Sequence, residues 1–196
     1  MAIPAPLRLA APGRPLRTAP QRIAVIRAIF ALVWAAALAL ALGDKVPTTA
    51  SDIPTGAALL LASYPLIDVA ASLAGSAFAD AGVLRVNAAI SAVAALAIGV
   101  TAFASDAGAT LAAFGAWAAV SGAIQLVVAI HRRRATGRQL PMILSGGLST
   151  IVGVSFLAAS GNEGAHLATL AGYMAFGAVL FLIWALRGDT TDRAVE

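Results

Sequence analysis

The chain has 196 residues, of which 60% are hydrophobic and 11% are charged, and its formal net charge is +4. A soluble domain of this length cannot bury so large a hydrophobic fraction, so the composition is typical of an integral membrane protein. The sequence contains no cysteine, which excludes disulfides, thiolate catalysis, iron–sulfur clusters and the usual zinc sites.

Residues 1–22 read MAIPAPLRLAAPGRPLRTAPQR, a segment rich in proline, alanine and arginine without a helical period. We expect a disordered cytoplasmic arm that is attracted to anionic lipid headgroups. Because an apolar run follows this basic leader, a cleaved signal peptide is an alternative interpretation. The length of the leader and of the run favours an uncleaved membrane anchor.

Six apolar stretches follow, and each is long enough for a helix to cross a hydrocarbon core of about 30 Å. None alternates polar and apolar residues as a membrane β-strand does, whereas a helix satisfies its own backbone hydrogen bonds in lipid. We therefore predict an all-α polytopic membrane protein, with a transmembrane domain at residues 23–187 and a cytoplasmic tail at 188–196. The six transmembrane helices are expected at residues 23–42, 56–75, 86–104, 110–130, 140–160 and 165–186.

The basic residues lie almost entirely on one side of these spans. If the N-terminus is inside, all twelve arginines fall in or beside cytoplasmic segments, and Lys45 alone lies outside. The positive-inside rule then predicts an N-in/C-in protein of the bacterial inner (plasma) membrane. Basic residues at span ends, rather than along a stripe, argue against nucleic acid as a partner. A cluster of expected lipid-headgroup contacts, which topology alone also explains, comprises Arg132, Arg133, Arg134 and Arg138.

Alternate spans resemble one another, which indicates an internal repeat. The second, fourth and sixth spans carry aromatic residues that lie 53 and 56 residues apart. The aligned positions hold Tyr64, Trp117 and Tyr173, then, four residues later, Asp68, Ser121 and Gly177, and, eight residues later, Ser72, Gln125 and Phe181. We interpret the six spans as three repeated helical hairpins of one ancestral type.

Residues four apart share a helix face, so the polar residues of the spans fall into stripes. Small and polar residues at this spacing let transmembrane helices approach closely and form hydrogen bonds, and such packing is the common use of these stripes. The expected intramembrane polar cluster comprises Asp68, Tyr64, Ser72, Arg27, Arg85, Asn87, Ser91, Ser121 and Gln125.

Asp68 is the main functional candidate, because a charged side chain at the centre of a membrane helix costs about 2.5 to 3.5 kcal/mol. Arg27 and Arg85 can extend their side chains from the cytoplasmic surface to its depth, and Ser91 lies at the same depth. In one interpretation, Asp68 pairs with one of these arginines and fixes the helix register. In a second, it is a titratable group on a proton or solute path, and in a third it is protonated and inert.

The hairpins resemble the HdeD acid-resistance family of bacterial inner-membrane proteins. The resemblance covers residues 59–187 and rests on LLASYPLIDVAASLAG, GAWAAVSGAIQLVVAIHRRR, GRQLPMILSGGLSTIVGVSF and GYMAFGAVLFLIWALR. It implies six spans built from repeated hairpins, an association with survival of acid stress, and no cofactor. The sequence departs from the family pattern at Val69, where a glycine is expected, and at Gln125, which replaces an acidic residue.

The sequence offers no catalytic or metal-ligating set whose members lie on one membrane face, so we expect neither an enzyme nor a metal or cofactor site. The resemblance implies a non-enzymatic contribution to acid or envelope-stress tolerance. One alternative is a small transporter or channel for protons or a small solute, which would use the polar layer around Asp68. Another is a membrane scaffold that forms homo-oligomers or binds other membrane proteins through its small-residue helix faces.

Overall fold

The computed structural model describes residues 19–43, 52–78, 81–136, 139–163 and 166–186. All regular secondary structure in these ranges is α-helical, and each helix is long and apolar enough to cross a membrane. The expected all-α class and the six expected helices of membrane-spanning length are therefore confirmed. The helices are α1 (Ala19–Leu42), α2 (Thr55–Gly75), α3 (Ala81–Ala104), α4 (Ala107–Thr136), α5 (Leu140–Ala159) and α6 (Ala168–Leu186).

Several helices extend beyond the expected spans, because a helix does not have to end where the apolar run ends. α1 begins at Ala19, within the segment expected to be a disordered arm, and Pro20 lies in its first turn, where a missing N–H breaks no helical hydrogen bond. α4 begins directly after Asp106, whose Oδ1 accepts a hydrogen bond of 2.7 Å from the backbone N–H of Ala109. At its other end α4 continues to Thr136. The rest of the expected arm and the C-terminal tail lie outside the described residues.

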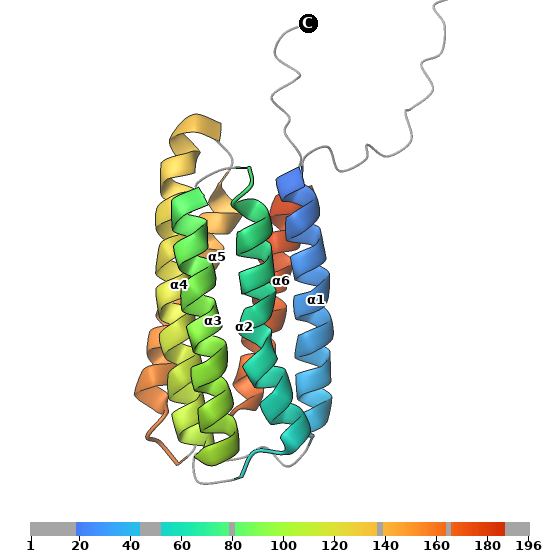
Figure 1. Cartoon of the computed structure of the whole chain (residues 1–196), viewed down its shortest axis with the longest axis vertical. Coiled ribbons are helices and arrows are strands. Elements are labelled where there is room, and N and C mark those ends of the chain that lie inside the picture. The colour runs from blue at the N-terminus through green and yellow to red at the C-terminus, as the bar shows by residue number, and fades with distance from the viewer. Residues whose placement is uncertain (1–18, 44–51, 79–80, 137–138, 164–165, 187–196) are drawn as a thin grey trace, which may run out of the picture.

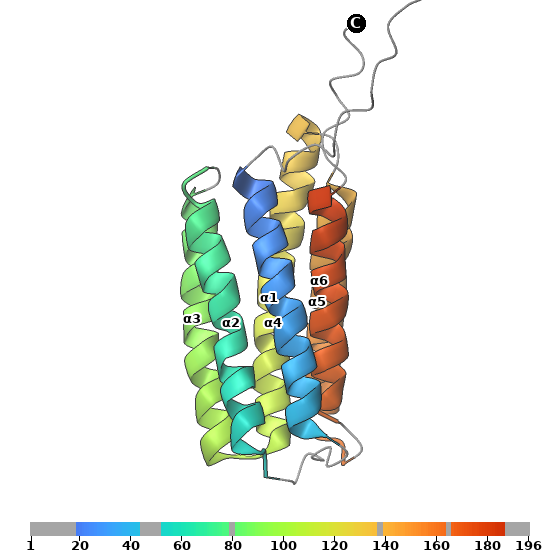
Figure 2. The same ribbon diagram turned by 90° about the vertical axis from the view of Figure 1, so that its right-hand side faces the viewer.

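The helices stand side by side with alternating direction and close into a ring in chain order (Figures 1 and 2). Each helix contacts the next one, and α6 contacts α1. The most extensive contacts join α4 to α5, α2 to α3 and α1 to α6, whereas α5 and α6 make the least extensive contact. The ring encloses a central space that side chains from all six helices can reach.

The two ends of the ring differ in charge. The N-termini of α1, α3 and α5 and the C-termini of α2, α4 and α6 lie at one end, which we name the basic end after Arg22, Arg85, Arg132 and Arg133. The opposite end, which we name the acidic end, carries exposed Asp52, Asp106 and Glu163. Within the described residues, charge is therefore separated along the ring axis.

The distribution of side chains is that of a membrane protein. Large apolar side chains cover the outside of the ring, including Leu40, which is 83% exposed, and Leu96, which is 72% exposed. Polar side chains lie inside, including Asp68, which is 3% exposed, and Ser91, which is fully buried. Water would make such an apolar exterior unfavourable, whereas lipid solvates it. The chain is therefore a multi-pass membrane protein.

Glycines bring α4 and α5 together. A Cβ atom on Gly122 would lie 2.7 Å from the α5 backbone, and one on Gly146 would lie 2.6 Å from the α4 backbone. Gly115 and Gly153 make an equivalent contact two turns away, each seven residues from the other glycine of its helix. Because such an approach leaves no room for a side chain, these small residues are used for packing within the chain.

An apolar core fills the half of the ring toward the acidic end. The ring of Phe114 is fully buried, with its centroid 5.1 Å from that of Trp117, 5.9 Å from that of Tyr64 and 6.1 Å from that of Tyr173. Edge-to-face and stacked aromatic pairs at these separations pack well. The surrounding fully buried apolar side chains are Leu38, Leu61, Ile98, Leu111, Leu167, Leu170 and Met174. We name the four rings of Phe114, Trp117, Tyr64 and Tyr173 the aromatic plug. Together with the surrounding apolar side chains, this plug fills the interior of the described structure toward the acidic end.

Candidate functional site: a buried ion pair beside a polar cavity

Asp68 lies inside the ring, and both of its carboxylate oxygens have partners. Oδ1 is 2.6 Å from the guanidinium Nη2 of Arg27 on α1. Oδ2 accepts hydrogen bonds from Asn87 Nδ2 at 2.7 Å and from Ser91 Oγ at 2.8 Å, both on α3. Asn87 Nδ2 also donates to Ser72 Oγ at 3.0 Å. Asp68 therefore joins three helices, and its burial cost is offset by charge-assisted hydrogen bonds.

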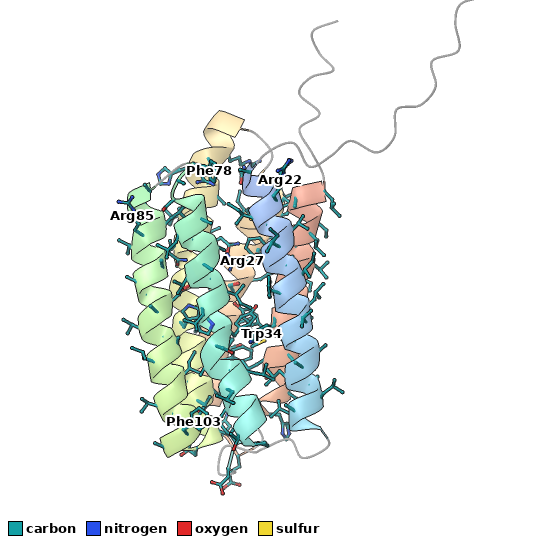
Figure 3. The ribbon with its side chains drawn as sticks, turned by 45° about the vertical axis from the view of Figure 1, so that its right-hand side comes forward. Arg22, Arg27, Trp34, Phe78, Arg85 and Phe103 are labelled. Carbon is teal, nitrogen blue, oxygen red and sulfur yellow. The ribbon has the colours of Figure 1, made fainter. Side chains whose placement is uncertain are left out.

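Of the two arginines considered from the sequence, Arg27 reaches Asp68 and Arg85 does not. The guanidinium carbon of Arg27 also lies 4.2 Å from the ring centre of Phe181 on α6, which is a cation–π contact. Arg85 is exposed on the outer face of α3 (Figure 3). Figure 3 shows Arg27 in the interior, below the basic end. Arg27 thus holds the carboxylate and links α1 to both of its neighbours.

Polar contacts continue around the ring until it closes. The junctions beyond α3 are made by the hydrogen bonds Trp117 Nε1 to Ser91 Oγ (3.0 Å), Gln125 Nε2 to Met142 O (3.3 Å) and Tyr173 Oη to Ser149 Oγ (3.1 Å). Together with the contacts of Arg27 and Asp68, at least one polar or cation–π contact joins every pair of adjacent helices. Hydrogen bonds between membrane helices contribute about 0.6 to 1.7 kcal/mol each, so this set helps to fix the register of the ring.

A cavity of about 170 Å³ lies beside the ion pair. It extends from Trp117 and Tyr173, at the edge of the aromatic plug, to Arg132 and Gln139 near the basic end. The polar groups along it come from Arg27, Asp68, Ser72, Asn87, Ser121, Gln125 and Ser149. Asn87 Oδ1 and Ser121 Oγ are buried and have no hydrogen-bond partner among the described residues. Apolar side chains make up most of the rest of the wall, and a cavity with buried polar atoms that lack a partner is suited to water or a polar solute.

Of the expected polar cluster, seven residues lie around the cavity or bond to Asp68: Arg27, Asp68, Ser72, Asn87, Ser91, Ser121 and Gln125. Tyr64 packs against Trp117 in the aromatic plug, with ring centroids 5.8 Å apart, and Arg85 lies outside the ring. Of the expected headgroup contacts, Arg133 is exposed on α4, and Arg132 lines the cavity near the basic end. Arg138 and the side chain of Arg134 lie outside the described part of the chain.

Three contributors to the site were missed from the sequence. Phe114 is the hub of the aromatic plug, and its position three residues before Trp117 could have placed it on the same helix face. Phe181 was aligned in the repeat but was given no role as a cation–π partner. Gln139 lines the cavity from just before α5, and no pattern in the sequence indicates this.

Residues 90–158 match the family model of a short repeat of unknown function (DUF308). The match begins within α3, includes all of α4 and ends one residue before the end of α5, so it covers the closely packed α4–α5 pair and Ser91, Trp117, Ser121 and Gln125 of the site. It fits a membrane family of the HdeD type. No curated protein and no solved structure matches the chain.

Proposed function

We propose that the protein is a bacterial inner-membrane protein with both termini in the cytoplasm, and that it contributes to acid or envelope-stress tolerance without enzymatic chemistry. The arginines of the basic end support this orientation, because basic residues are retained on the cytoplasmic side. The short-repeat match and the resemblance to the HdeD family support the role. In this orientation the cavity faces the cytoplasm.

The proposal includes three related hairpins. The contacts within the hairpins α1–α2, α3–α4 and α5–α6 are less extensive than the contacts between them, α2 with α3, α4 with α5 and α6 with α1, and this alternation fits three equivalent units arranged around the ring. The aligned aromatics Tyr64, Trp117 and Tyr173 all face the interior and meet around Phe114. In one hairpin the position four residues after the aromatic holds Asp68, and in the other two it holds Ser121 and Gly177. The ion pair would then be a feature that one repeat adds to a shared scaffold.

The observation that carries the proposed activity is that the cavity is one-sided. Asp68 and Arg27 border it, and the aromatic plug separates it from the acidic end. A cavity that lies toward the basic end, with the aromatic plug between it and the acidic end, suits binding of a small polar solute rather than free conduction. The paired charges offer such a solute both a donor and an acceptor.

A second candidate function is transport of protons or of a small solute. The observation in its favour is that Asp68 borders the cavity instead of being sealed in apolar packing. Transport would also require an opening through the aromatic plug in some other conformation. An intramembrane carboxylate that a cavity reaches is a common element of such pathways.

Proton flux into reconstituted vesicles, measured for the wild type and for Asp68→Asn, separates these two functions. The binding function predicts equal background flux for both proteins, whereas flux that depends on Asp68 would establish transport. Survival of cells at low pH tests the role itself. When protein abundance is matched to that of the wild type, we expect Asp68→Asn to lower survival and Asp52→Asn, at the exposed acidic end, to leave survival unchanged. Equal survival of wild-type and deletion strains under acid and envelope stress would contradict the proposal.

A further inference from the structure

Two buried polar atoms beside the cavity have no hydrogen-bond partner among the described residues. They are Oδ1 of Asn87 on α3 and Oγ of Ser121 on α4. Both residues line the cavity of about 170 Å³ next to the ion pair, which we name the central cavity. A buried polar atom without a partner loses the hydrogen bonds that water would give it. The two atoms therefore indicate that a polar molecule occupies the central cavity.

The contacts of Asn87 determine which of its side-chain atoms lacks a partner. The carboxylate of Asp68, paired with Arg27, can only accept hydrogen bonds, so the atom 2.7 Å from its Oδ2 is the amide nitrogen. The same nitrogen donates to Ser72 Oγ at 3.0 Å. Both hydrogens of the amide are therefore used, and the remaining atom is an oxygen, which can only accept. Asp68 thus fixes the orientation in which Asn87 presents this acceptor.

The hydroxyl of Ser121 is not bonded to its own helix. Ser63 on α2 donates to Leu59 O at 2.7 Å, and Thr150 on α5 donates to Gly146 O at 2.9 Å. A bond of this kind to the preceding turn is a common way for a hydroxyl inside a helix to find a partner. Because Ser121 Oγ makes no such bond, its hydroxyl is available both to donate and to accept.

The chemistry of these two atoms favours a neutral occupant. An anion would place its negative charge against the lone pairs of Asn87 Oδ1, which offers no donor. A cation would need a negative charge that is not already compensated, whereas Asp68 is paired with Arg27 and has donors on both of its oxygens. A neutral molecule with an N–H or O–H group satisfies Asn87 Oδ1 without the cost of burying another charge.

We propose that the central cavity binds a small neutral solute that carries N–H or O–H donors, such as a primary amide, a urea or a polyol. One donor of the solute bonds to Asn87 Oδ1, and a second polar group bonds to Ser121 Oγ. The cavity is smaller than the roughly 300–1,000 Å³ that is typical of sites for drug-sized ligands, so the solute has only a few non-hydrogen atoms. This proposal rests on the proposed function, because both use the central cavity, and it names the class of solute.

Three isomeric amides test the need for a donor at nearly constant size. Propionamide has a primary amide, N-methylacetamide has a single N–H group, and N,N-dimethylformamide has no donor. Binding of each compound to the full-length protein in nanodiscs is measured by saturation-transfer-difference NMR, with the signal of empty nanodiscs subtracted. We expect affinity to fall in this order, and dimethylformamide to bind about tenfold more weakly than propionamide, the equivalent of about 1.4 kcal/mol.

Ser121→Ala tests the location of the site, because it removes one of the two atoms without a partner. It should weaken propionamide binding about tenfold and leave the weaker binding of dimethylformamide unchanged. The matched control is Ser155→Ala, which removes an exposed hydroxyl of α5 that donates to Val152 O at 2.7 Å. This control should bind both compounds as the wild type does.

Competition against propionamide distinguishes the two kinds of donor. Displacement at lower concentration by urea would assign the site to N–H donors, and displacement at lower concentration by glycerol would assign it to O–H donors. Equal binding of the three isomeric amides, or no binding of any of them above the empty nanodiscs, overturns the proposal. In the latter case the cavity holds water alone. Propionamide binding that Ser121→Ala does not weaken also overturns it, because the solute would then lie elsewhere.

Failure of this inference is distinguishable from failure of the proposed function. Access of water-soluble thiol reagents to Ser121→Cys reports on the cavity alone. If the reagents modify Ser121→Cys but none of the amides binds the wild type, the cavity stands and the neutral-solute proposal falls. If propionamide binds as expected while wild-type and deletion strains survive acid and envelope stress equally, the binding site stands and the proposed role falls.

Discussion

Arg27 of α1 and Asp68 of α2 form an ion pair of 2.6 Å inside the membrane-spanning ring, and the pair borders the central cavity. The arginine side chain is 26% exposed and the aspartate side chain 4% exposed. The pair therefore stands at a boundary between packed interior and polar cavity. The ion pair therefore holds α1 to α2 and also lines the candidate site. Removing either partner leaves an unpaired charge in the interior.

The ion pair makes a testable contribution to stability. We expect Arg27→Gln and Asp68→Asn each to lower the free energy of unfolding in mixed micelles by about 1 to 3 kcal/mol. The double variant should lose clearly less than the sum of the single losses, because the unpaired charge disappears with its partner.

The matched control is Arg85→Gln, which alters an exposed arginine of the same end and should change the free energy of unfolding by less than about 0.5 kcal/mol. Strict additivity of Arg27→Gln and Asp68→Asn would show that the two side chains do not interact in the membrane.

The glycine contact between α4 and α5 gives a second prediction. Gly146→Leu and Gly122→Leu should prevent folding or lower the unfolding free energy by roughly 3 kcal/mol or more, because each places a side chain where the partner backbone lies. Gly147→Leu is the matched control, since its Cβ position has no neighbour within 4 Å. Thermal unfolding followed by size-exclusion chromatography measures both. A stable, monodisperse Gly146→Leu protein would mean that the two helices are farther apart.

Membrane orientation can be tested directly, because the chain contains no cysteine. Single cysteines at Gly161, exposed at the acidic end, and at Phe78, exposed at the basic end, mark the two faces. In intact spheroplasts an impermeant maleimide should label Gly161→Cys, and it should label Phe78→Cys only after the membrane is permeabilised. The reverse pattern would place the cavity on the outer side of the membrane.

The fold was predictable from the sequence because apolar length and helix periodicity depend on local composition. The candidate site was predictable in part. Asn87, Ser91 and Ser121 could be placed by depth along their helices and by their spacing. Depth along the helix alone cannot predict whether Arg27 or Arg85 pairs with Asp68, because the answer depends on how α1 and α3 are rotated about their axes. Rotation is set by packing, and here the polar face of α3 that carries Asn87 points inward while Arg85 lies on the opposite face.

The groove of about 390 Å³ that lies between α5 and α6 was not predictable for a related reason. Gly153 and Gly172 are the same residue type in similar surroundings, yet the first touches a backbone and the second faces a groove. A glycine in the sequence indicates that two helices could approach closely at that position. Whether they do so depends on the arrangement of all six helices. The cavity has the same origin, because it is the space that remains when the ring closes.

The central claim is that a cavity reaches the Arg27–Asp68 pair from the basic end and stops at the aromatic plug, and the reactivity of single cysteines tests it most directly. A small charged methanethiosulfonate reagent should modify Ser121→Cys, beside the cavity, when it is added to the basic side of sealed vesicles. The same reagent added to the acidic side should leave Ser121→Cys unmodified. Leu170→Cys, fully buried in the acidic half, should resist it from both sides. An unreactive Ser121→Cys, or one modified from the acidic side, would contradict the account.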